Sequence, residues 1–379
     1  MDIRLATRGS ELAMGQAAIV ADALRDRRHE VELVEVETEG DRIRDELIHR
    51  LGTTGAFVRS LDEEVLDGTV DAAVHSMKDM PTEFPDDLVV AGVPERAAAG
   101  DRLVTPDDNT LDELPKGAVV GTSSLRRQAQ VRNRRSDLTV EPLRGNVDTR
   151  VRKLLAPHRQ REHERRLAAE ENHVKGEDED HDEGAKPNDG ADAGGDGHGP
   201  PADDRSAEEW FDDLAEIERE ALELAVDTEY DAIVLAAAGL ERSGLARHVP
   251  THGLPVERAV PAPGQGAMAV TARDDDVGRV IQQVVDHPRT RIETTVERTI
   301  LAELGGGCVA PIGVYALLQG SKVRTTVQVL DRAGEETVSA TRELPVDDYV
   351  AGARSFAAAL GDRGADDLIA AAVAEGRDG

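Results

Sequence analysis

The stretch DAAVHSMKD at residues 71–79 joins a short apolar run to a polar turn. The apolar run predicts a buried strand over 71–75, and the serine, lysine and aspartate after it are typical of a turn. Three other turns repeat this order, with Ser, Thr or Gly and a basic residue directly after an apolar run: TRGS at 7–10, GTSSLRR at 121–127 and LRGN at 143–146. In sheets whose strands alternate with helices, ligands bind at the carboxyl ends of the strands. These turns are therefore where we expect the functional residues.

The rest of the chain alternates in the same way. Short apolar runs predict strands at 3–6, 31–36, 71–75, 88–93, 118–121, 138–143, 232–236, 267–272, 314–318 and 322–330. Amphipathic stretches predict helices at 11–27, 57–67, 124–133, 147–155, 274–285, 289–304 and about 349–360. Alternation of this kind predicts the α/β class, with mixed sheets.

Length and charge limit the possible functions. The chain has 379 residues, enough for two or three domains, and a net charge of −31. Such a charge argues against binding to nucleic acid or to an anionic membrane surface. The basic residues are 39 arginines and only 6 lysines. An acidic, lysine-poor surface is typical of a protein that works in high salt, so we expect a halophilic protein.

The apolar runs of the chain bear on its location, and its cysteine content bears on its redox chemistry. No apolar run approaches the roughly 20 residues of a membrane span, and the first residues do not resemble a signal peptide. We therefore expect a cytoplasmic protein. The single cysteine, Cys308, excludes a disulfide framework within the chain. With one cysteine and no paired histidine spacing, no metal site is expected.

Residues 155–229 differ in composition from the rest, with 25 acidic and 8 basic residues, net −17. The middle part, 176–204, is rich in Gly, Asp and Pro and has too few apolar residues to order itself. Helices are predicted on both sides, at 159–174 and 206–226. Ser206, with Glu209 three residues on, predicts a capping box at the start of the second helix. We expect a charged insertion at about 156–228 in a surface loop.

Cations collect at the predicted strand ends. Ser124 is placed to cap a helix, and Arg126 and Arg127 then lie in its first turn, where positive charge is mildly unfavourable. They are explained if an anion binds between them; the alternative is that they pair with acidic residues of the protein itself. Basic residues also occur in or just beyond the other turns, at Arg8, Lys78, Arg144 and Arg150. Together they predict binding of a small polyanion.

Two further residues are candidates for chemistry. Asp79 could transfer protons, or it could simply cap a turn. Cys308 lies in GGGCVAP at 305–311, where three glycines would let backbone and thiol approach a ligand closely. A reactive thiol and an inert buried one both remain open on this basis.

Seven motifs, in this order, resemble those of the hydroxymethylbilane synthases, also called porphobilinogen deaminases. They extend from about residue 3 to 315, leaving out the insertion, and read LATRGS (5–10), AVHSMKD (73–79), GTSSLRR (121–127), LRGNV (143–147), LAAAGL (235–240), PGQG (263–266) and GGC (306–308).

The resemblance implies a reaction. The family condenses four porphobilinogen molecules head to tail with release of ammonia, then hydrolyses the product to hydroxymethylbilane, in porphyrin biosynthesis. The chain grows on a dipyrromethane cofactor bound by a thioether to one cysteine, here Cys308. Asp79 matches the catalytic aspartate, which protonates the leaving amine and stabilises positive azafulvene and pyrrole intermediates.

The resemblance also implies which residues bind carboxylates. Those matched to the cofactor are Lys78, Ser123, Ser124, Arg126, Arg127 and Arg144. Those matched to the substrate are Arg8, Ser10, Arg150 and Arg242, with Gln265 in the loop beside the interdomain cleft.

The implied fold has three α/β domains. The first two resemble the lobes of type II periplasmic binding proteins, and the third is a small α+β domain that carries the cofactor cysteine. We expect the first domain at 1–96 plus 266–286, the second at 97–265 and the third at 287–379. A monomer is expected, with possible hand-off of the product to uroporphyrinogen-III synthase.

Three departures from the family, one of them the insertion, and two alternatives remain. Thr54, in the loop 50–57, stands where the family often has lysine, and Val309 stands where a polar residue is usual. The main alternative function is a two-lobed protein that binds an organic anion without catalysis. The other is an enzyme that forms a Schiff base through Lys78.

Overall fold

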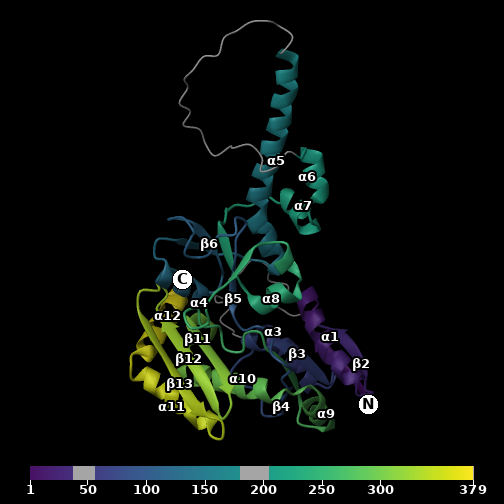
Figure 1. Ribbon diagram of the computed structural model, residues 1–379. Helices are drawn as coiled ribbons and strands as arrows, with labels where there is room; N and C mark the ends of the chain where they lie inside the picture. Colours follow the sequence, from purple (N-terminus) through teal and green to yellow (C-terminus); the bar gives the residue numbers. More distant parts are fainter. Residues whose placement is uncertain (37–55, 180–204, 379) are drawn as a thin grey trace.

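The computed structural model describes residues 1–36, 56–179 and 205–378, which form three sheets with their helices (Figure 1). The first sheet has the order β2-β1-β3-β10-β4, comprising β2 (Glu30–Glu35), β1 (Asp2–Thr7), β3 (Ala72–Ser76), β10 (Met268–Arg273) and β4 (Leu88–Gly92). Strand β1 is parallel to β2 and β3, whereas β10 is antiparallel to both of its neighbours. We call this sheet and its helices lobe A.

Helices cover both faces of lobe A. On one face, α1 (Glu11–Arg25) and α9 (Asp276–Val285) pack side by side and share a core with the sheet, as with Leu24 and Ile281. On the other face lies α3 (Ala56–Leu66), whose Leu61 packs against the sheet. Burial of one apolar stripe from each helix explains why these amphipathic stretches form helices here.

The second sheet has the order β7-β6-β8-β5-β9, comprising β7 (Thr139–Glu141), β6 (Val119–Gly121), β8 (Ala232–Ala236), β5 (Asp101–Val104) and β9 (Thr251–Gly253). Its helices are α4 (Leu125–Arg134), α5 (Val147–Glu179) and α8 (Ala237–Arg242), with a 3₁₀ turn at Leu245–Arg247. Three parallel strands are again followed by one antiparallel strand, here β5. We call this sheet and its helices lobe B; it repeats the strand arrangement of lobe A.

The third unit is a meander of β11 (Ile312–Gln319), β12 (Lys322–Leu330) and β13 (Thr337–Pro345). Three helices pack on it: α10 (Pro288–Leu304), α11 (Tyr349–Gly361) and α12 (Ala365–Asp378). The fully buried residues of their core are aliphatic apart from Phe356, which agrees with the low aromatic content of the whole chain. The structure therefore has three α/β units, as the sequence predicts.

All ten predicted strands are present in the described part of the chain; β8 and β12 have the predicted ends, and the other eight are shifted by one or more residues. Three strands were not predicted: β5, β9 and β13. Strands β5 and β9 are only four and three residues long, and β13 is an edge strand whose sequence TVSATRELP leaves most side chains partly or fully exposed. Apolar patterning is weak in such strands, since tertiary pairing decides them. Helices α8 and α12 were also missed.

The insertion differs from the prediction in its helices. The predicted helices 147–155 and 159–174 are one helix, α5, which continues through Pro157. The predicted helix 206–226 is instead two, α6 (Ala207–Asp213) and α7 (Glu216–Leu222), because the backbone is extended at Leu214. The capping box of Ser206 and Glu209 is confirmed.

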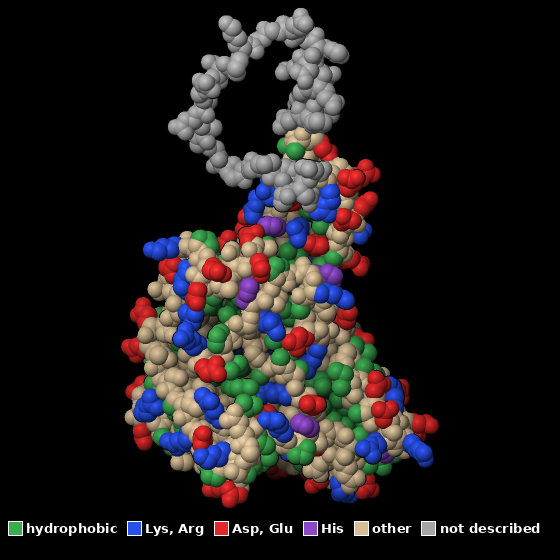
Figure 2. Space-filling view, in the orientation of Figure 1, with side chains coloured by type: hydrophobic (Ala, Val, Ile, Leu, Met, Phe, Trp, Pro, Cys, Tyr) green, Lys and Arg blue, Asp and Glu red, His purple; other side chains and the backbone are tan. Residues whose placement is uncertain are grey.

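The base of this insertion belongs to lobe B. Ala156 is buried in one core cluster with Ile217 and Ala221, so this segment is packed. Further out, α5 extends away from the body, with α6 and α7 beside it (Figure 1). Acidic side chains gather over α6 and α7 (Figure 2). The predicted Gly/Asp/Pro-rich centre lies mostly outside the described residues.

The chain crosses between lobes A and B twice, at 93–100 and 259–267. The two crossings touch where the Ala97 amide donates to the Gly266 carbonyl, 3.2 Å away. Gly266 has φ +84°, and a Cβ there would lie 2.7 Å from the Ala97 carbonyl oxygen. Only glycine allows the two crossings to approach so closely. Among the described residues, no helix is long and apolar enough to span a membrane.

Candidate active site

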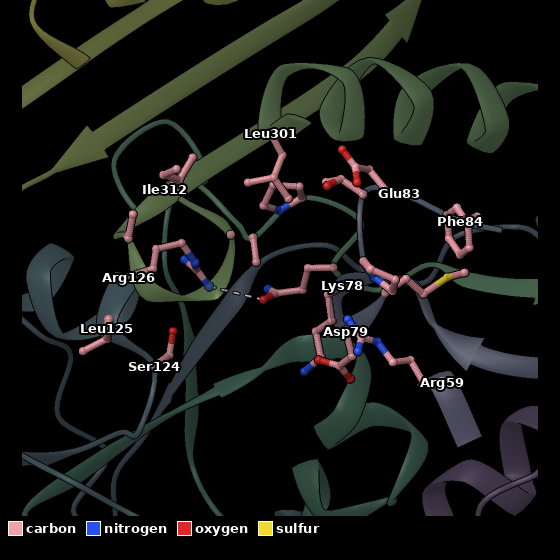
Figure 3. Close-up of a pocket in the computed structure, with 18 of the residues that line it drawn as sticks. Arg59, Lys78, Asp79, Glu83, Phe84, Ser124, Leu125, Arg126, Leu301 and Ile312 are labelled. Atoms are coloured by element: carbon pink, nitrogen blue, oxygen red, sulfur yellow. Dashed lines mark hydrogen bonds between the residues drawn. The ribbon is translucent and has the colours of Figure 1, made fainter. Parts of the chain in front are cut away.

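A cavity of about 930 Å³ lies where the two lobes and the third unit meet (Figure 3). Eight of the thirteen residues predicted for the site line it: Lys78, Asp79, Ser123, Ser124, Arg126, Arg127, Arg150 and Gln265. Figure 3 shows Ser124 and Arg126 on one side, with Lys78 and Asp79 facing them. Two of the four predicted polar turns, 71–79 and 121–127, thus meet at the cavity.

Lys78 and Asp79 are brought to the cavity by strand β3. The strand is buried and ends at Ser76, and a 3₁₀ turn, Met77–Asp79, follows. The Met77 amide donates to the carbonyl of Ala267, 3.0 Å away, which holds the turn against the second crossing. Both side chains are exposed. The carboxylate and the ammonium are therefore accessible to a ligand in the cavity.

Arg126 and Arg127 lie in the first turn of α4, whose N-terminus Ser124 caps. Both are buried and share one carboxylate: Asp101 accepts from Arg126 Nη2 and from Arg127 Nη2, each at 2.8 Å. Burial would raise the pKa of Asp101, but the charges and hydrogen bonds of the two arginines outweigh it and lower the pKa to about 2. Pairing with an acidic residue, one of the two alternatives, thus occurs. Two cations on one anion still leave a surplus positive charge beside the cavity.

Two features of this cluster favour an additional anion. Arg126 Nε is buried and has no hydrogen-bond partner among the described residues. Arg150 forms no ion pair with a described residue; its Nε donates to the Gly145 carbonyl, 2.8 Å away. Burial and the nearby charge of Arg127 lower the pKa of Arg150 to about 10, so it remains cationic at neutral pH. Uncompensated cations in a cavity are a binding site for carboxylates.

Gln265 is almost fully buried and connects the two crossings to the arginines. Its Oε1 accepts from Arg126 Nη2 at 3.2 Å, the bond drawn in Figure 3. Its Nε2 donates to the Ala99 carbonyl at 2.6 Å and to Asp101 Oδ1 at 2.8 Å. Its amide thus orients the arginine cluster.

Four predicted residues do not line the cavity. Arg8 is half-buried, and the side chain of Ser10 caps α1 by accepting from the Ala13 amide. Arg242 donates to the carbonyl of Gly266 at 3.1 Å. Arg144 is half-buried in the turn after β7.

Cys308 lies in a 3₁₀ turn, Gly307–Val309, between α10 and β11. The three preceding glycines all have positive φ, +71° at Gly305, +79° at Gly306 and +50° at Gly307. At Gly306 a Cβ would lie 2.7 Å from a side-chain atom of Ile369, so the turn requires glycine there. Gly307 lines the cavity, so the turn that carries Cys308 borders it.

Sequence reasoning missed three residues of this region. Arg59 on α3 lines the cavity and is exposed. Asp101 begins a four-residue strand that carried no signal. Glu297 on α10 accepts from both Arg96 Nη atoms, at 2.8 and 3.0 Å, and from the Gly264 amide at 2.7 Å, and thereby fixes the third unit to the crossings. The pairings of Asp101 with Arg126 and of Glu297 with Arg96 join residues far apart in sequence, so no local pattern predicts them.

Two further expectations concern loops and metals. The loop 50–57 with Thr54 lies almost entirely outside the described residues. Within the described ranges, no group of three or more His, Cys, Asp or Glu side chains is arranged to hold a metal ion.

Comparison with known proteins identifies the family. The profile "Porphobilinogen deaminase, dipyromethane cofactor binding domain" matches residues 3–162 and 218–280, and "Porphobilinogen deaminase, C-terminal domain" matches 291–362. A probable porphobilinogen deaminase of Halobacterium salinarum is 56% identical, covering 97% of each chain. That of Methanococcoides burtonii is 34% identical over 98% of this chain and 97% of its own. The porphobilinogen deaminase of Brevibacillus brevis is 35% identical over 98% of each.

Similarity to solved structures is more distant. The methionine binding protein MetQ covers 75% of this chain and 89% of its own, with a TM-score of 0.36 and 11% identity, and no inference rests on that likeness. The sequence matches span nearly the whole chain. The chain belongs to the porphobilinogen deaminase family.

Proposed function

We propose that this chain is a hydroxymethylbilane synthase, a transferase that joins four porphobilinogen molecules with release of ammonia and hydrolyses the product to hydroxymethylbilane. The observation that carries the proposal is the cavity, where an exposed carboxylate at Asp79 faces a cluster of buried arginines beside the turn of Cys308. An anion-binding protein without catalysis needs neither the accessible acid nor the cysteine, so that alternative is not favoured.

The residues present fit a dipyrromethane cofactor attached to Cys308. Its carboxylates would meet the surplus charge beside Asp101 and the unpartnered Nε of Arg126. We assign Lys78, Ser123, Ser124, Arg126, Arg127 and Arg144 to holding the cofactor. When bound, the cofactor supplies the pyrrole end to which the first substrate is joined.

Asp79 is assigned the proton transfer. In the acid form its carboxyl donates a proton to the substrate's amino group, which leaves as ammonia. The carboxylate that results faces the substrate's positively charged ring and stabilises it electrostatically. Accessibility at the end of β3 supports this role. Lys78, its neighbour, is left to bind carboxylates rather than to form a Schiff base.

Substrate carboxylates are assigned to Arg8, Ser10, Arg150 and Arg242, with Gln265 positioning the arginines. Because each porphobilinogen brings two carboxylates, a growing chain needs more cations than the cofactor alone. Arg150, which has no acidic partner among the described residues, is the strongest of these candidates.

The proposal extends to organisation and setting. We divide the chain into 1–96 plus 266–286, 97–265 and 287–379, one sheet in each part, which supports the division. The acidic, lysine-poor composition supports work in high salt. Cytoplasmic location, a monomeric state and hand-off to uroporphyrinogen-III synthase belong to the same proposal.

Intact mass together with turnover tests it. The purified protein should exceed its sequence mass by one dipyrromethane, and Cys308→Ser should lose both this adduct and activity. Asp79→Asn should keep the adduct but lose at least about 100-fold in kcat. Asp87→Asn, an exposed aspartate outside the cavity, is the matched control and should change neither. An unmodified mass in active wild-type protein contradicts the cofactor assignment, and near-normal turnover of Asp79→Asn contradicts the proton-transfer role.

A further inference from the structure

A second cavity, of about 600 Å³, lies in lobe B on the face of the sheet that carries α4. It is bounded by the outer half of α4, by the segment 110–112 and by strand β9 with the residues after it up to 259. The volume is in the range of small-molecule sites. Apart from Arg127, no residue assigned above to the cofactor, the substrate or proton transfer lines this cavity.

Comparison of the lobes shows that the cavity is part of the architecture. In lobe A the chain passes from the antiparallel strand β10 into α9, which packs beside α1 and buries Ile281 and Val285 against the sheet. In lobe B the chain leaves the corresponding strand, β5, and residues 105–118 form no helix. The space beside α4, over β5 and β9, is therefore not filled by a helix.

The walls combine an apolar floor with charged side chains of both signs, among them Asp112, Glu257 and Arg258. Leu111, Val131 and Leu254 belong to or pack against one core cluster and present an apolar surface. At the rim, Arg134 pairs with Asp112 and is neutralised. Arg258 is exposed there and forms no ion pair with any described residue, although its charge acts on nearby Asp112. A flat apolar body with one acid group matches this surface, the acid group facing Arg258.

The deep end of this cavity touches the active site. Arg127 lines both cavities, and Asp101, which holds Arg126 and Arg127 in place, lines the second. Arg127 Nη1 also donates to the Val234 carbonyl, 3.2 Å away, and Val234 is part of the same wall. One side of the Arg127 guanidinium faces the active-site cavity. A ligand in the second cavity would contact its other side.

We propose that the second cavity binds a small organic acid with a flat apolar body, and that this ligand changes the affinity of the active site for porphobilinogen through Arg127. Coupling between sites is reciprocal, so substrate would change the affinity of the acid by the same factor. The coupling rests on the function proposed above, but the binding does not. The two are therefore measured separately.

Binding is measured with 1-anilinonaphthalene-8-sulfonate, a flat apolar acid whose fluorescence rises in apolar sites, added to the cofactor-loaded full chain. We expect saturable 1:1 binding. Leu254→Trp, which fills the cavity, should weaken it at least about tenfold. Arg258→Gln should weaken it roughly two- to fivefold, whereas Glu257→Gln, the adjacent exposed carboxylate, should leave it equal or stronger. Arg258 and Glu257 do not line the active-site cavity, so turnover of these two variants without the probe should stay unchanged.

Two controls make the result decisive. Arg27→Glu, an exposed arginine of lobe A, and Arg150→Gln in the active-site cavity should both keep probe binding. Loss of binding in Arg150→Gln, or unchanged binding in Leu254→Trp, would place the probe elsewhere and overturn the site. For the coupling, the KM for porphobilinogen should shift with bound probe in the wild type and not in Leu254→Trp. If saturating probe leaves the KM unchanged, the coupling is refuted but binding in the second cavity is not. If the KM shifts equally in wild type and Leu254→Trp, the probe acts from another place, and both the site and the coupling are refuted.

Discussion

Lobes A and B have the same strand arrangement but differ in charge at one corresponding position. In lobe B the antiparallel strand begins at Asp101, which lies opposite Ala236, the last residue of β8. In lobe A the corresponding strand begins at Met268, opposite Ser76, the last residue of β3. One lobe therefore has a buried carboxylate where the other has an apolar side chain.

This difference assigns the lobes different tasks. The carboxylate in lobe B allows two arginines to be buried in fixed positions, as recognition of carboxylates requires. Lobe A buries no such cluster at this position, and its charged pair, Lys78 and Asp79, is exposed on the turn. In the proposed function, lobe B holds an anion in one place and lobe A presents an accessible acid to it.

The largest effect is expected from Asp101→Asn. Removing the carboxylate leaves two buried arginines without a counter-ion, which should lower the free energy of unfolding by about 3–5 kcal/mol. Denaturant titration of wild type and variant at equal salt measures this. The matched control is Asp112→Asn, whose partner Arg134 is partly exposed, with an expected change of about 1 kcal/mol or less. Equal losses in the two variants would contradict the assigned role of the cluster.

The reverse change in lobe A should also destabilise the protein. Met268 is 2% exposed, and Met268→Asp would bury a carboxylate without the arginines of lobe B, at a cost of about 2–4 kcal/mol. Met268→Leu keeps the apolar volume and should change stability by less than about 1.5 kcal/mol. A stable Met268→Asp protein would mean that lobe A can supply a cation there. The measurement is again the free energy of unfolding.

Acid should remove the contribution of Asp101. Its folded-state pKa, about 2, is below the ordinary value of 3.8, so the stabilisation is complete above pH 4 and is lost as the pH falls towards 2. The shift corresponds to about 2 kcal/mol. The difference in stability between wild type and Asp101→Asn should therefore shrink over this interval and stay constant from pH 5 to 7. A constant difference down to pH 2 would exclude this titration.

The smallest effect is expected from shortening the insertion of lobe B. Residues 163–217 lie outside the match to the family profile, although Ile217 packs in the core of lobe B. Removing 163–213 and joining the ends with about six Gly and Ser residues should leave kcat/KM within about twofold, because no described residue of this segment lines the cavity. Circular dichroism controls for folding. A tenfold loss of kcat/KM in folded protein would give the insertion a function.

Sequence alone predicted those parts of the structure that depend on local pattern. Strands β1 and β3 and the turns after them follow from apolar runs that end in polar residues, and such turns lie at one end of a sheet. The pairing of Asp101 with Arg126 did not follow, because it depends on a short strand placed by contacts with β8 and β9. Likewise, Gln265 matched a motif of the family, but its bridging role depends on how closely the two crossings approach.

At Pro157 a strong local signal, a proline, predicted a break in the helix that the structure does not have. Separate helices were expected before and after it, yet α5 is continuous there, because its buried face packs on lobe B through Leu154 and Ala156 and on α7. Tertiary packing outweighs the lost backbone hydrogen bond of the proline.

The double crossing also determines the order in which the chain can fold during synthesis. Among the described strands, β4 pairs with β10 alone, so Val90 cannot pair before Thr271, 181 residues later, has been synthesised. All five strands of lobe B lie between the two and can pair first. As the ribosome releases the chain, lobe B can fold while an unfinished edge of lobe A remains open. Nascent chains ending near residue 255 should therefore resist protease in lobe B and be cleaved in lobe A.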